Sequence, residues 1–330
     1  GRPRVGRLFF RYFADVNTLL TNLLAGAVDA SGPAPSGIFF GQGLQLEELI
    51  AQGRAPGLVV KFGPTTVFDA LVLNHDVPFF RDRRVRQALA HATDRESISQ
   101  ALFKGKQPVA HSFISSHFPG YLQSIRKYPY DLDRARALLQ EAGYTMGSDG
   151  VLRAPDGSRF SVVFTVATGN RDRERAQQVI RENWRRIGVE AVIQNLPSRV
   201  ISAEMYFQRR YRGLLINSHS ANADYSNADR FFASWEVRPV GESSRNVLGY
   251  RNARMDELIR QYLQEPDEAK RMRKLQEWQA FFAEELPLIP LYAWTAAWAY
   301  KEGLENFQPT GTSGIPSPFT WNAHLWQWRK

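Results

Sequence analysis

The sequence predicts a mixed α/β fold that extends over more than one domain. Its 330 residues are about twice the ~150 of an average domain, and 43% of them are hydrophobic, which is enough for a sizeable core. Apolar runs rich in β-branched residues alternate with amphipathic helical segments. Residues 160–196 contain a strand, a helix and a strand in succession, which indicates a crossover between two parallel strands.

Short strands and helices are expected in the first 74 residues. We predict a strand at 7–13, helices at 17–24 and 44–52, and strands at 58–63 and 67–74. Four leucines give the first helix an apolar stripe, and Gly53 ends the second helix. The segment 31–43 is rich in glycine and proline and is predicted to be a loop.

Periodic helices and further strands are predicted between residues 83 and 219. The predicted elements are helices at 83–92, 94–102 and 131–142, a hairpin around 151–154, a strand at 160–167, a helix at 172–187, a strand at 189–196, a helix at 201–208 and a strand at 213–219. Asp94 and Asp131 stand where helices need N-cap residues. Ala176, Val179 and Ile180 are expected on the buried face of the helix at 172–187.

Two more helices, with apolar stripes over 255–262 and 272–282, are predicted before the C-terminal segment. Pro287 and Pro290 are expected to break the chain that follows into short extended pieces. We expect one compact unit at about 75–295, and we expect the flanks at 1–74 and 296–330 to belong together.

Composition and charge exclude several classes of protein. Cysteine is absent, so disulfides, thiolate metal sites and cysteine nucleophiles are excluded. The net charge of +9 invites a nucleic-acid interpretation, but the arginines of 171–186 alternate with acidic residues as on a solvated helix face, and no nucleic-acid motif accompanies them. The uncharged run 286–300 is shorter than the ~20 residues of a membrane span and contains two prolines.

No motif for catalysis, metal binding or phosphate binding has the required spacing. The patterns G-x-S-x-G, H-E-x-x-H and the glycine-rich phosphate loops are absent. Asp224, Ser226 and Asp229 resemble the start of a calcium loop, but its sixth position is Asp229 instead of glycine and its twelfth is Trp235 instead of glutamate. The sequence therefore predicts no catalytic residue, no metal site and no cofactor.

Small and polar residues follow the strand predicted at 213–219. The run from Asn217 to Tyr225 lies where residues at the carboxyl end of a strand in an α/β sheet often line a ligand crevice. Asp224 is an acid without a neighbouring base in that run. On these residues alone, a turn or capping aspartate is the alternative interpretation.

Residues 74–95 contain the run F-x-D-x-R-V-R-Q-A-L-x-x-A-x-D-R, which ends at Arg95. This run resembles the signature of the extracellular solute-binding proteins of family 5, the dipeptide-, oligopeptide- and nickel-binding proteins of ABC importers. Further segments resemble the family in the family's order, at 25–29, 130–144, 149–157, 246–256 and 286–292. The resemblance therefore covers nearly the whole chain.

The resemblance implies a periplasmic binding protein-like fold of type II, with a mixed sheet flanked by helices in the second lobe plus part of lobe I. Residues 1–74 would be the second segment of lobe I, 75–295 the second ligand-binding lobe, and 296–330 the C-terminal return to lobe I. The family's export signal and an N-terminal portion of the same protein would precede this chain. The protein would then be periplasmic or on the cell surface, with a lipid anchor as an option.

The resemblance also implies a function and a site. The run around Ala223 and Asp224 resembles the segment in which peptide-binding relatives use an aspartate to hold the ligand's α-amino group. The expected ligand-binding residues are Asp224, Tyr225, Asn222, Ser220 and His219. The family's frequent aromatic three residues before that aspartate is Ala221 here, which leaves peptide, opine, sugar and metal complex open as ligands.

The expected partners are therefore a small-molecule or peptide ligand and the permease subunits of an ABC transporter, with no nucleic acid. A sensor domain that binds without transport is the alternative. A hydrolase on the same fold is disfavoured, because the sequence has no assembled nucleophile or metal motif.

Overall fold

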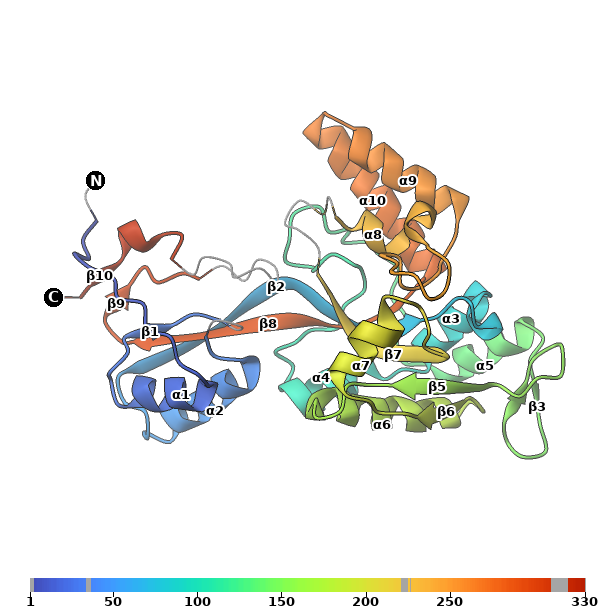
Figure 1. Ribbon diagram of the computed structural model, residues 1–330, viewed down its shortest axis with the longest axis horizontal. Helices are drawn as coiled ribbons and strands as arrows, with labels where there is room; N and C mark the ends of the chain where they lie inside the picture. The colour runs from blue at the N-terminus through green and yellow to red at the C-terminus, as the bar shows by residue number, and fades with distance from the viewer. Residues whose placement is uncertain (1–2, 34–36, 221–224, 226, 310–319, 330) are drawn as a thin grey trace. The chain divides into compact units, whose positions relative to one another are not determined.

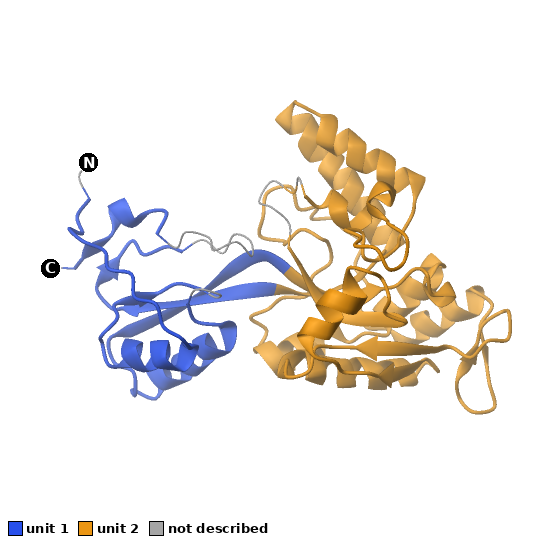
Figure 2. Ribbon diagram, viewed as in Figure 1, with its two compact units in different colours: residues 1–67, 294–330 blue, residues 68–293 orange. Residues whose placement is uncertain are grey.

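Two long strands, β2 (Leu58–Leu73) and β8 (Ile289–Lys301), carry the chain between the two units into which it divides. The computed structural model describes residues 3–33, 37–220, 225, 227–309 and 320–329 (Figure 1). The smaller unit consists of Gly1–Val67 with Trp294–Lys330, and the larger unit is Phe68–Ala293 (Figure 2).

The smaller unit contains two helices and short strands beside its parts of β2 and β8. Its elements are α1 (Val16–Leu24), β1 (Ala30–Ser31), α2 (Phe40–Ala51), β9 (Leu304–Glu305), η4 (Ala323–Leu325) and β10 (Gln327–Trp328). β1 pairs with β8 in antiparallel register, with Ala30 opposite Tyr300. Buried leucines of α1 and α2 pack with Ala297 and Ala299 of β8 into a core of this unit's own.

The larger unit combines a mixed sheet with most of the helices. Its helical elements are η1 (Pro78–Phe80), α3 (Arg83–His91), α4 (Arg95–Phe103), α5 (Leu132–Glu141), α6 (Arg171–Arg185), α7 (Ser198–Val200), the π-helical turn η2 (Ile201–Tyr206), α8 (Asp229–Phe232), η3 (Ser234–Glu236), α9 (Ala253–Gln264) and α10 (Glu268–Glu285). Its further strands are β3 (Thr145–Met146), β4 (Leu152–Arg153), β5 (Ser161–Thr165), β6 (Glu190–Ile193) and β7 (Gly213–Ser220).

The sheet of the larger unit has the strand order β8-β2-β7-β5-β6. β5 runs parallel to both β6 and β7, so the predicted strand–helix–strand crossover is confirmed. β2 and β7 are antiparallel. Two contacts show this: the Asn74 amide donates to the Gly213 carbonyl at one end, and the Phe68 ring stacks on His219 at the other. The sheet is therefore mixed.

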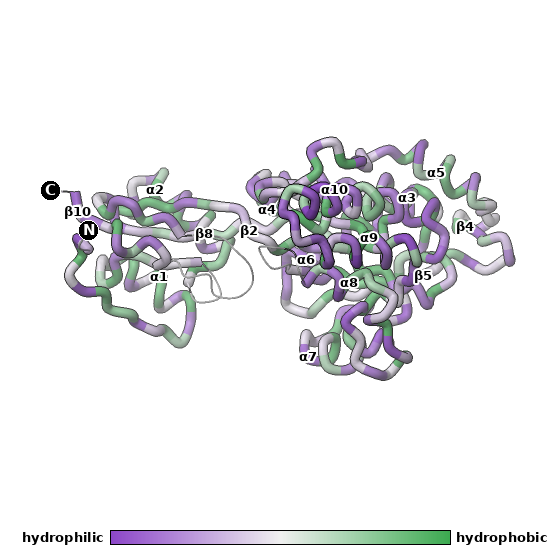
Figure 3. The backbone as a smooth tube through the Cα atoms, turned by 90° about the horizontal axis from the view of Figure 1, so that it is seen from above, coloured by the Kyte–Doolittle hydropathy of each residue, from purple (hydrophilic) through white to green (hydrophobic). Residues whose placement is uncertain are grey.

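Aromatic side chains fill the main core of the larger unit. Phe113 contacts Phe232, Trp278 and Phe282, with ring centroids 4.6 to 5.4 Å apart. The antiparallel helices α9 and α10 pack against each other, as α3 and α5 do (Figure 1). Hydrophobic and hydrophilic residues alternate along α9 and α10 (Figure 3), so each helix buries one face, as their sequence stripes predict.

Several predictions for the smaller unit are wrong. Residues 7–13 form no strand, and Phe9 and Tyr12 are 81% and 93% exposed. The second helix begins at Phe40 and includes Gly43, where a Cβ would overlap the side chain of Ala297. That glycine allows close packing and does not mark a loop.

The breaks predicted in β2 and β8 are also wrong, because each is one continuous strand. β2 continues through Pro64 as a single strand from Leu58 to Leu73. Pro290 is the second residue of β8, a position close to the strand start where proline is tolerated.

One residue of the predicted buried face of α6 is misplaced. Val179 is 39% exposed, whereas Ala176, Ile180 and Trp184 are buried. These three residues follow the i, i+4, i+8 spacing of a single helix face. Arg173 lies on the same buried face, and it is part of the site described next.

Candidate functional site

The carboxyl ends of β5 and β7 lie at one edge of the larger unit's sheet, since the two strands are parallel neighbours. After β5, the chain turns through Gly169, which has a φ of +87°, directly into α6. The side chain of Asn170 caps this helix by accepting a hydrogen bond from the Arg173 amide at 3.2 Å. The run that the sequence singles out for ligand binding begins inside β7, at Asn217, and extends beyond the end of this strand.

The structure describes three of the five predicted ligand residues, and Asn222 and Asp224 lie outside the described residues. Ser220 is the half-buried last residue of β7. Tyr225 is 3% exposed and has a φ of +56°, a left-handed conformation that is unusual for a tyrosine. Its hydroxyl has no hydrogen-bond partner among the described residues, and burial raises its pKa above the ordinary value.

His219 is buried between two aromatic rings. The Phe68 ring stacks on it with centroids 5.6 Å apart, and the Phe231 ring meets it edge-on at 4.7 Å. Neither ring nitrogen has a hydrogen-bond partner within the described part of the chain. Burial lowers the pKa of His219 to about 4, although Asp69 opposes this change. His219 is therefore a neutral side chain at pH 7.

A buried polar cluster lies next to His219, and it was not among the site residues predicted from the sequence. Arg173 donates two hydrogen bonds to the Asp69 carboxylate, from Nε at 2.8 Å and from Nη2 at 2.7 Å. The Tyr292 hydroxyl donates to the same carboxylate at 3.1 Å. We call these three residues the Asp69 cluster, which joins β2, α6 and β8.

The charge state of the Asp69 cluster follows from its geometry. Burial disfavours the Arg173 cation, but the Asp69 carboxylate outweighs burial and raises the pKa of Arg173. One signal in the sequence could have found this pair. Asp69 stands inside the apolar run V-F-D-A-L-V-L, and a carboxylate in a buried strand needs a partner. The interpretation of Arg173 as part of a solvated helix face is wrong.

The family-like run at 74–95 lies at the other end of β7. Asn74 donates to the carbonyls of Tyr211 and Gly213, at 2.6 Å from its side chain and 3.0 Å from its amide. Gly213 and Ser220 are the two ends of this strand. At ~3.3 Å per residue, about 23 Å of strand separates this run from the predicted ligand residues.

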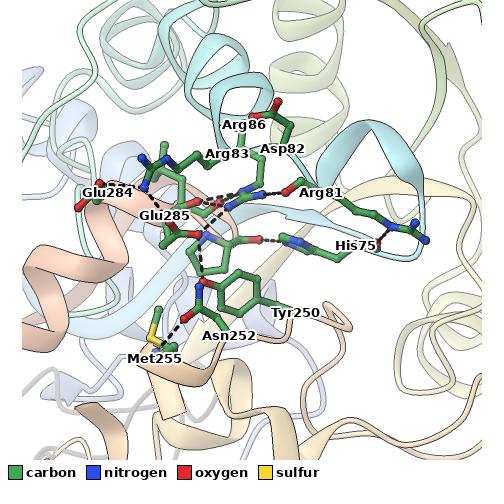
Figure 4. Close-up of polar contacts among 12 residues, drawn as sticks. His75, Arg81, Asp82, Arg83, Arg86, Tyr250, Asn252, Met255, Glu284 and Glu285 are labelled. Carbon is green, nitrogen blue, oxygen red and sulfur yellow. Dashed lines mark hydrogen bonds and ion pairs between the residues drawn. The ribbon is translucent and has the colours of Figure 1, made fainter. Parts of the chain in front are cut away.

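Arg86 is the centre of a second polar cluster, formed by Arg86, His75, Tyr250 and Glu285 (Figure 4). Its guanidinium is buried and donates to the carbonyl oxygens of Phe80, Arg81, Glu285 and Leu286 at 2.5 to 2.9 Å. It also pairs with the Glu285 carboxylate at 3.3 Å. We call this group the Arg86 cluster. Its bonds join α3 to the end of α10, so the role of Arg86 is structural.

His75 contributes to the Arg86 cluster as a neutral donor. Its Nε2 lies 2.8 Å from the Pro287 carbonyl, which only accepts hydrogen bonds, so Nε2 carries the proton. Burial, with Arg86 as the next cause, lowers the pKa of His75 to about 3.

Within the described ranges, no group of three or more His, Asp or Glu side chains is arranged to hold a metal ion. None of the helices in those ranges is long and apolar enough to cross a bilayer.

Solved structures define the class of protein. The crystal structure of an oligopeptide-binding protein from Thermus thermophilus, complexed with a pentapeptide, matches with a TM-score of 0.75 and 31% identity, over 96% of this chain and 56% of that chain. AppA from Bacillus subtilis, in complex with a nonapeptide, matches with a TM-score of 0.74 and 24% identity, over 96% of this chain and 59% of that chain. The fold is that of the periplasmic binding proteins, a mixed sheet flanked by helices, as the sequence predicts.

The sequence comparisons identify the family. The sequence model described as "Bacterial extracellular solute-binding proteins, family 5 Middle" matches residues 1–238. The chain belongs to this family, whose members are binding proteins and not enzymes. The predicted resemblance is confirmed.

Curated relatives in the family carry different names. The oligopeptide-binding protein AppA of Bacillus subtilis is 25% identical over 312 residues, 93% of this chain and 54% of the relative. Heme-binding protein A of Haemophilus influenzae is 24% identical over 327 residues, 98% of this chain and 54% of the relative. Glutathione-binding protein GsiB of Escherichia coli K12 is 24% identical over 314 residues, 93% of this chain and 56% of the relative. The chain spans about half the length of these relatives.

Proposed function

We propose that the full-length protein captures a small solute outside the cytoplasmic membrane and delivers it to the permease subunits of an ABC importer. Membership of family 5, over residues 1–238, is the observation that carries this proposal. In it, the larger unit is the second ligand-binding lobe, the smaller unit is part of lobe I, and the solute is held between lobes that close on it. The protein would be periplasmic or attached to the cell surface.

A peptide is the solute that we favour. The oligopeptide-binding protein from Thermus thermophilus is 31% identical to this chain over the aligned residues, which make up 56% of that protein, and it was crystallised with a pentapeptide. Other relatives are named for heme and glutathione, so family membership alone leaves the solute open. The choice of peptide rests on the run A-D-Y around Asp224, whose carboxylate suits the α-ammonium group of a peptide.

The residues on both sides of Asp224 support its role as the ammonium partner. Tyr225 belongs to the buried core of the larger unit, and Phe231 packs against that core and against His219. When the residues near a ligand-binding carboxylate are already packed in the core, less conformational entropy of the protein is lost as the ligand binds.

Two forms of one probe test this role in the full-length protein. The probe is a pool of random pentapeptides, prepared once with free amino termini and once N-acetylated. We expect Asp224→Ala to weaken binding of the free peptides by about a hundredfold, since an unpaired buried ammonium costs about 3 kcal/mol. N-acetylation should weaken binding to the unmodified protein by a similar factor. Titration calorimetry measures both effects.

The matched control is Asp229→Ala, which removes a half-buried carboxylate five residues away and should change the affinity less than threefold. Acetylated peptides should bind the Asp224→Ala variant at least as tightly as the unmodified protein, because only the unmodified protein keeps a carboxylate that they leave unpaired. Equal binding of free and acetylated peptides to the unmodified protein would contradict the assignment of Asp224. Binding of heme or glutathione without any binding of peptides would overturn the choice of solute.

A further inference from the structure

The Asp69 cluster lies beside both passages of the chain between the two units. The units divide between Val67 and Phe68 on β2 and between Ala293 and Trp294 on β8. Asp69 is two residues from the first division, and Tyr292 is two residues from the second. The hydrogen bond between these two side chains therefore joins the two strands at the point where each leaves the larger unit.

Arg173 connects this point to the candidate site. It lies in the first turn of α6, and α6 begins directly after β5 at the carboxyl edge of the sheet. On β7, the neighbouring His219 contacts Phe68, the first residue of the larger unit. Arg173 thus bonds the edge where we place the ligand directly to β2, and Tyr292 connects β8 to the same Asp69 carboxylate.

The stability of the fold does not explain why these charges are buried. The side chains of Arg173 and Asp69 are 10% and 3% exposed. Removing two ions from water is energetically costly, and apolar replacements of buried ion pairs are often neutral or stabilising. What the pair provides instead is geometry, because a bidentate guanidinium–carboxylate contact fixes both distance and orientation.

We propose that Asp69, Arg173 and Tyr292 are positioning residues for solute capture. They hold the departing ends of β2 and β8 in a fixed arrangement against α6, so that ligand binding at the carboxyl edge is coupled to the movement of one unit against the other. This proposal rests on the proposed function, in which the lobes close on a solute.

The test removes the whole cluster at once in the full-length protein. The triple variant Asp69→Leu, Arg173→Met and Tyr292→Phe keeps the side-chain volumes similar and removes both charges of the ion pair together, so it should fold with an unchanged or higher Tm. We expect it to bind the random pentapeptide pool at least tenfold more weakly. We also expect a smaller ligand-induced decrease in the radius of gyration by X-ray scattering.

Two controls separate positioning from a general effect of charge. Arg185→Met removes an exposed arginine of α6 that pairs with Glu182, and it should leave both measurements unchanged. Arg173→Lys keeps the charge but loses the bidentate contact, and it should reproduce most of the loss. A triple variant with unaltered affinity and compaction would overturn the proposal.

Hydrogen exchange keeps this test independent of the solute. If the unmodified protein binds no peptide, the peptide assignment fails. Amide hydrogen exchange in the unliganded protein still tests whether the Asp69 cluster fixes the ends of β2 and β8. The amides of 66–70 and 291–294 should exchange at least tenfold faster in the triple variant than in the unmodified protein. Equal exchange at these amides would overturn the proposal whatever the solute is.

Discussion

At the scale of single residues, buried arginines connect distant segments of the chain through hydrogen bonds to backbone carbonyls. Arg95 donates to the carbonyls of Ala110, Pro290 and Tyr128, and burial lowers its pKa to about 10, so it remains charged at neutral pH. The sequence places such an arginine in a family-like run but gives no indication of its partners. They are backbone carbonyls up to about two hundred positions away, and every residue type provides a carbonyl.

Replacing Arg86 tests this architecture. Arg86→Met removes a buried donor that four carbonyl oxygens share and one of the partners of the Glu285 carboxylate, so we expect a loss of about 3 kcal/mol in the free energy of unfolding. Urea unfolding measures this loss. Arg83→Met is the control from the same helix, because its side chain is 52% exposed and its ion pairs should contribute about 1 kcal/mol or less. Equal losses in the two variants would contradict a structural role for Arg86.

At the scale of secondary-structure elements, helices were more predictable than strands. Asp94 and Asp131 cap α4 and α5 as expected, by accepting from the amides of Ser97 and Arg134 at 3.0 and 2.8 Å. Helix caps and stripes are local, so a window of a dozen residues contains them. The continuity of β2 and β8 depends on partners far away in sequence, and local proline and glycine signals were therefore misleading there.

The turn that joins α6 to β6 offers an element-scale prediction. Gly188 has a φ of +79°, and an added Cβ would lie 2.9 Å from Met146 and 3.0 Å from Leu152. Gly169, at the other end of α6, has a φ of +87° with open space around it. Both alanine variants should lose about 1 kcal/mol through backbone strain, and Gly188→Ala should lose a further 1 kcal/mol or more through overpacking. Thermal unfolding compares the two, and identical losses would contradict the crowding.

At the scale of the whole molecule, the sequence revealed the family and the class of fold but not the placement of the ligand groups. The run at 74–95 was sufficient for recognition. The aromatic contacts of His219 and the Asp69 cluster depend on the strand order β8-β2-β7, which no local pattern encodes. Asp224, the residue on which the ligand proposal depends most, lies outside the described residues.

The stability of the chain should depend on pH through its buried histidines. Burial lowers the pKa of His75 to about 3 and that of His219 to about 4, both from 6.5. Between pH 6.5 and 5 the unfolded chain binds protons that the folded chain does not, so the free energy of unfolding falls as the pH falls. Each histidine contributes a slope of up to about 1.4 kcal/mol per pH unit. Urea unfolding from pH 7 to pH 5 measures the slope.

His75→Gln keeps a donor for the Pro287 carbonyl and removes the proton that His75 binds in the unfolded chain. Between pH 6 and pH 5, the slope of the free energy of unfolding against pH should therefore fall by close to the contribution of one proton, about 1.4 kcal/mol per pH unit. A slope identical to that of the unmodified protein would show that His75 binds its proton equally in both states.

The Arg86 cluster and the carboxyl edge of the sheet are far apart, so residues at that edge can be changed without altering the cluster. The hydrogen bonds of the family-like run at 74–95 lie at the amino end of β7. The segment that we assign to ligand binding lies at its carboxyl end. An engineer who rewrites only residues 220–224 for a new analyte leaves those bonds intact and keeps the buried side chains of His219 and Tyr225. Libraries built in that segment should retain the parent's folding yield while their binding preferences diverge, which is the requirement for a biosensor scaffold.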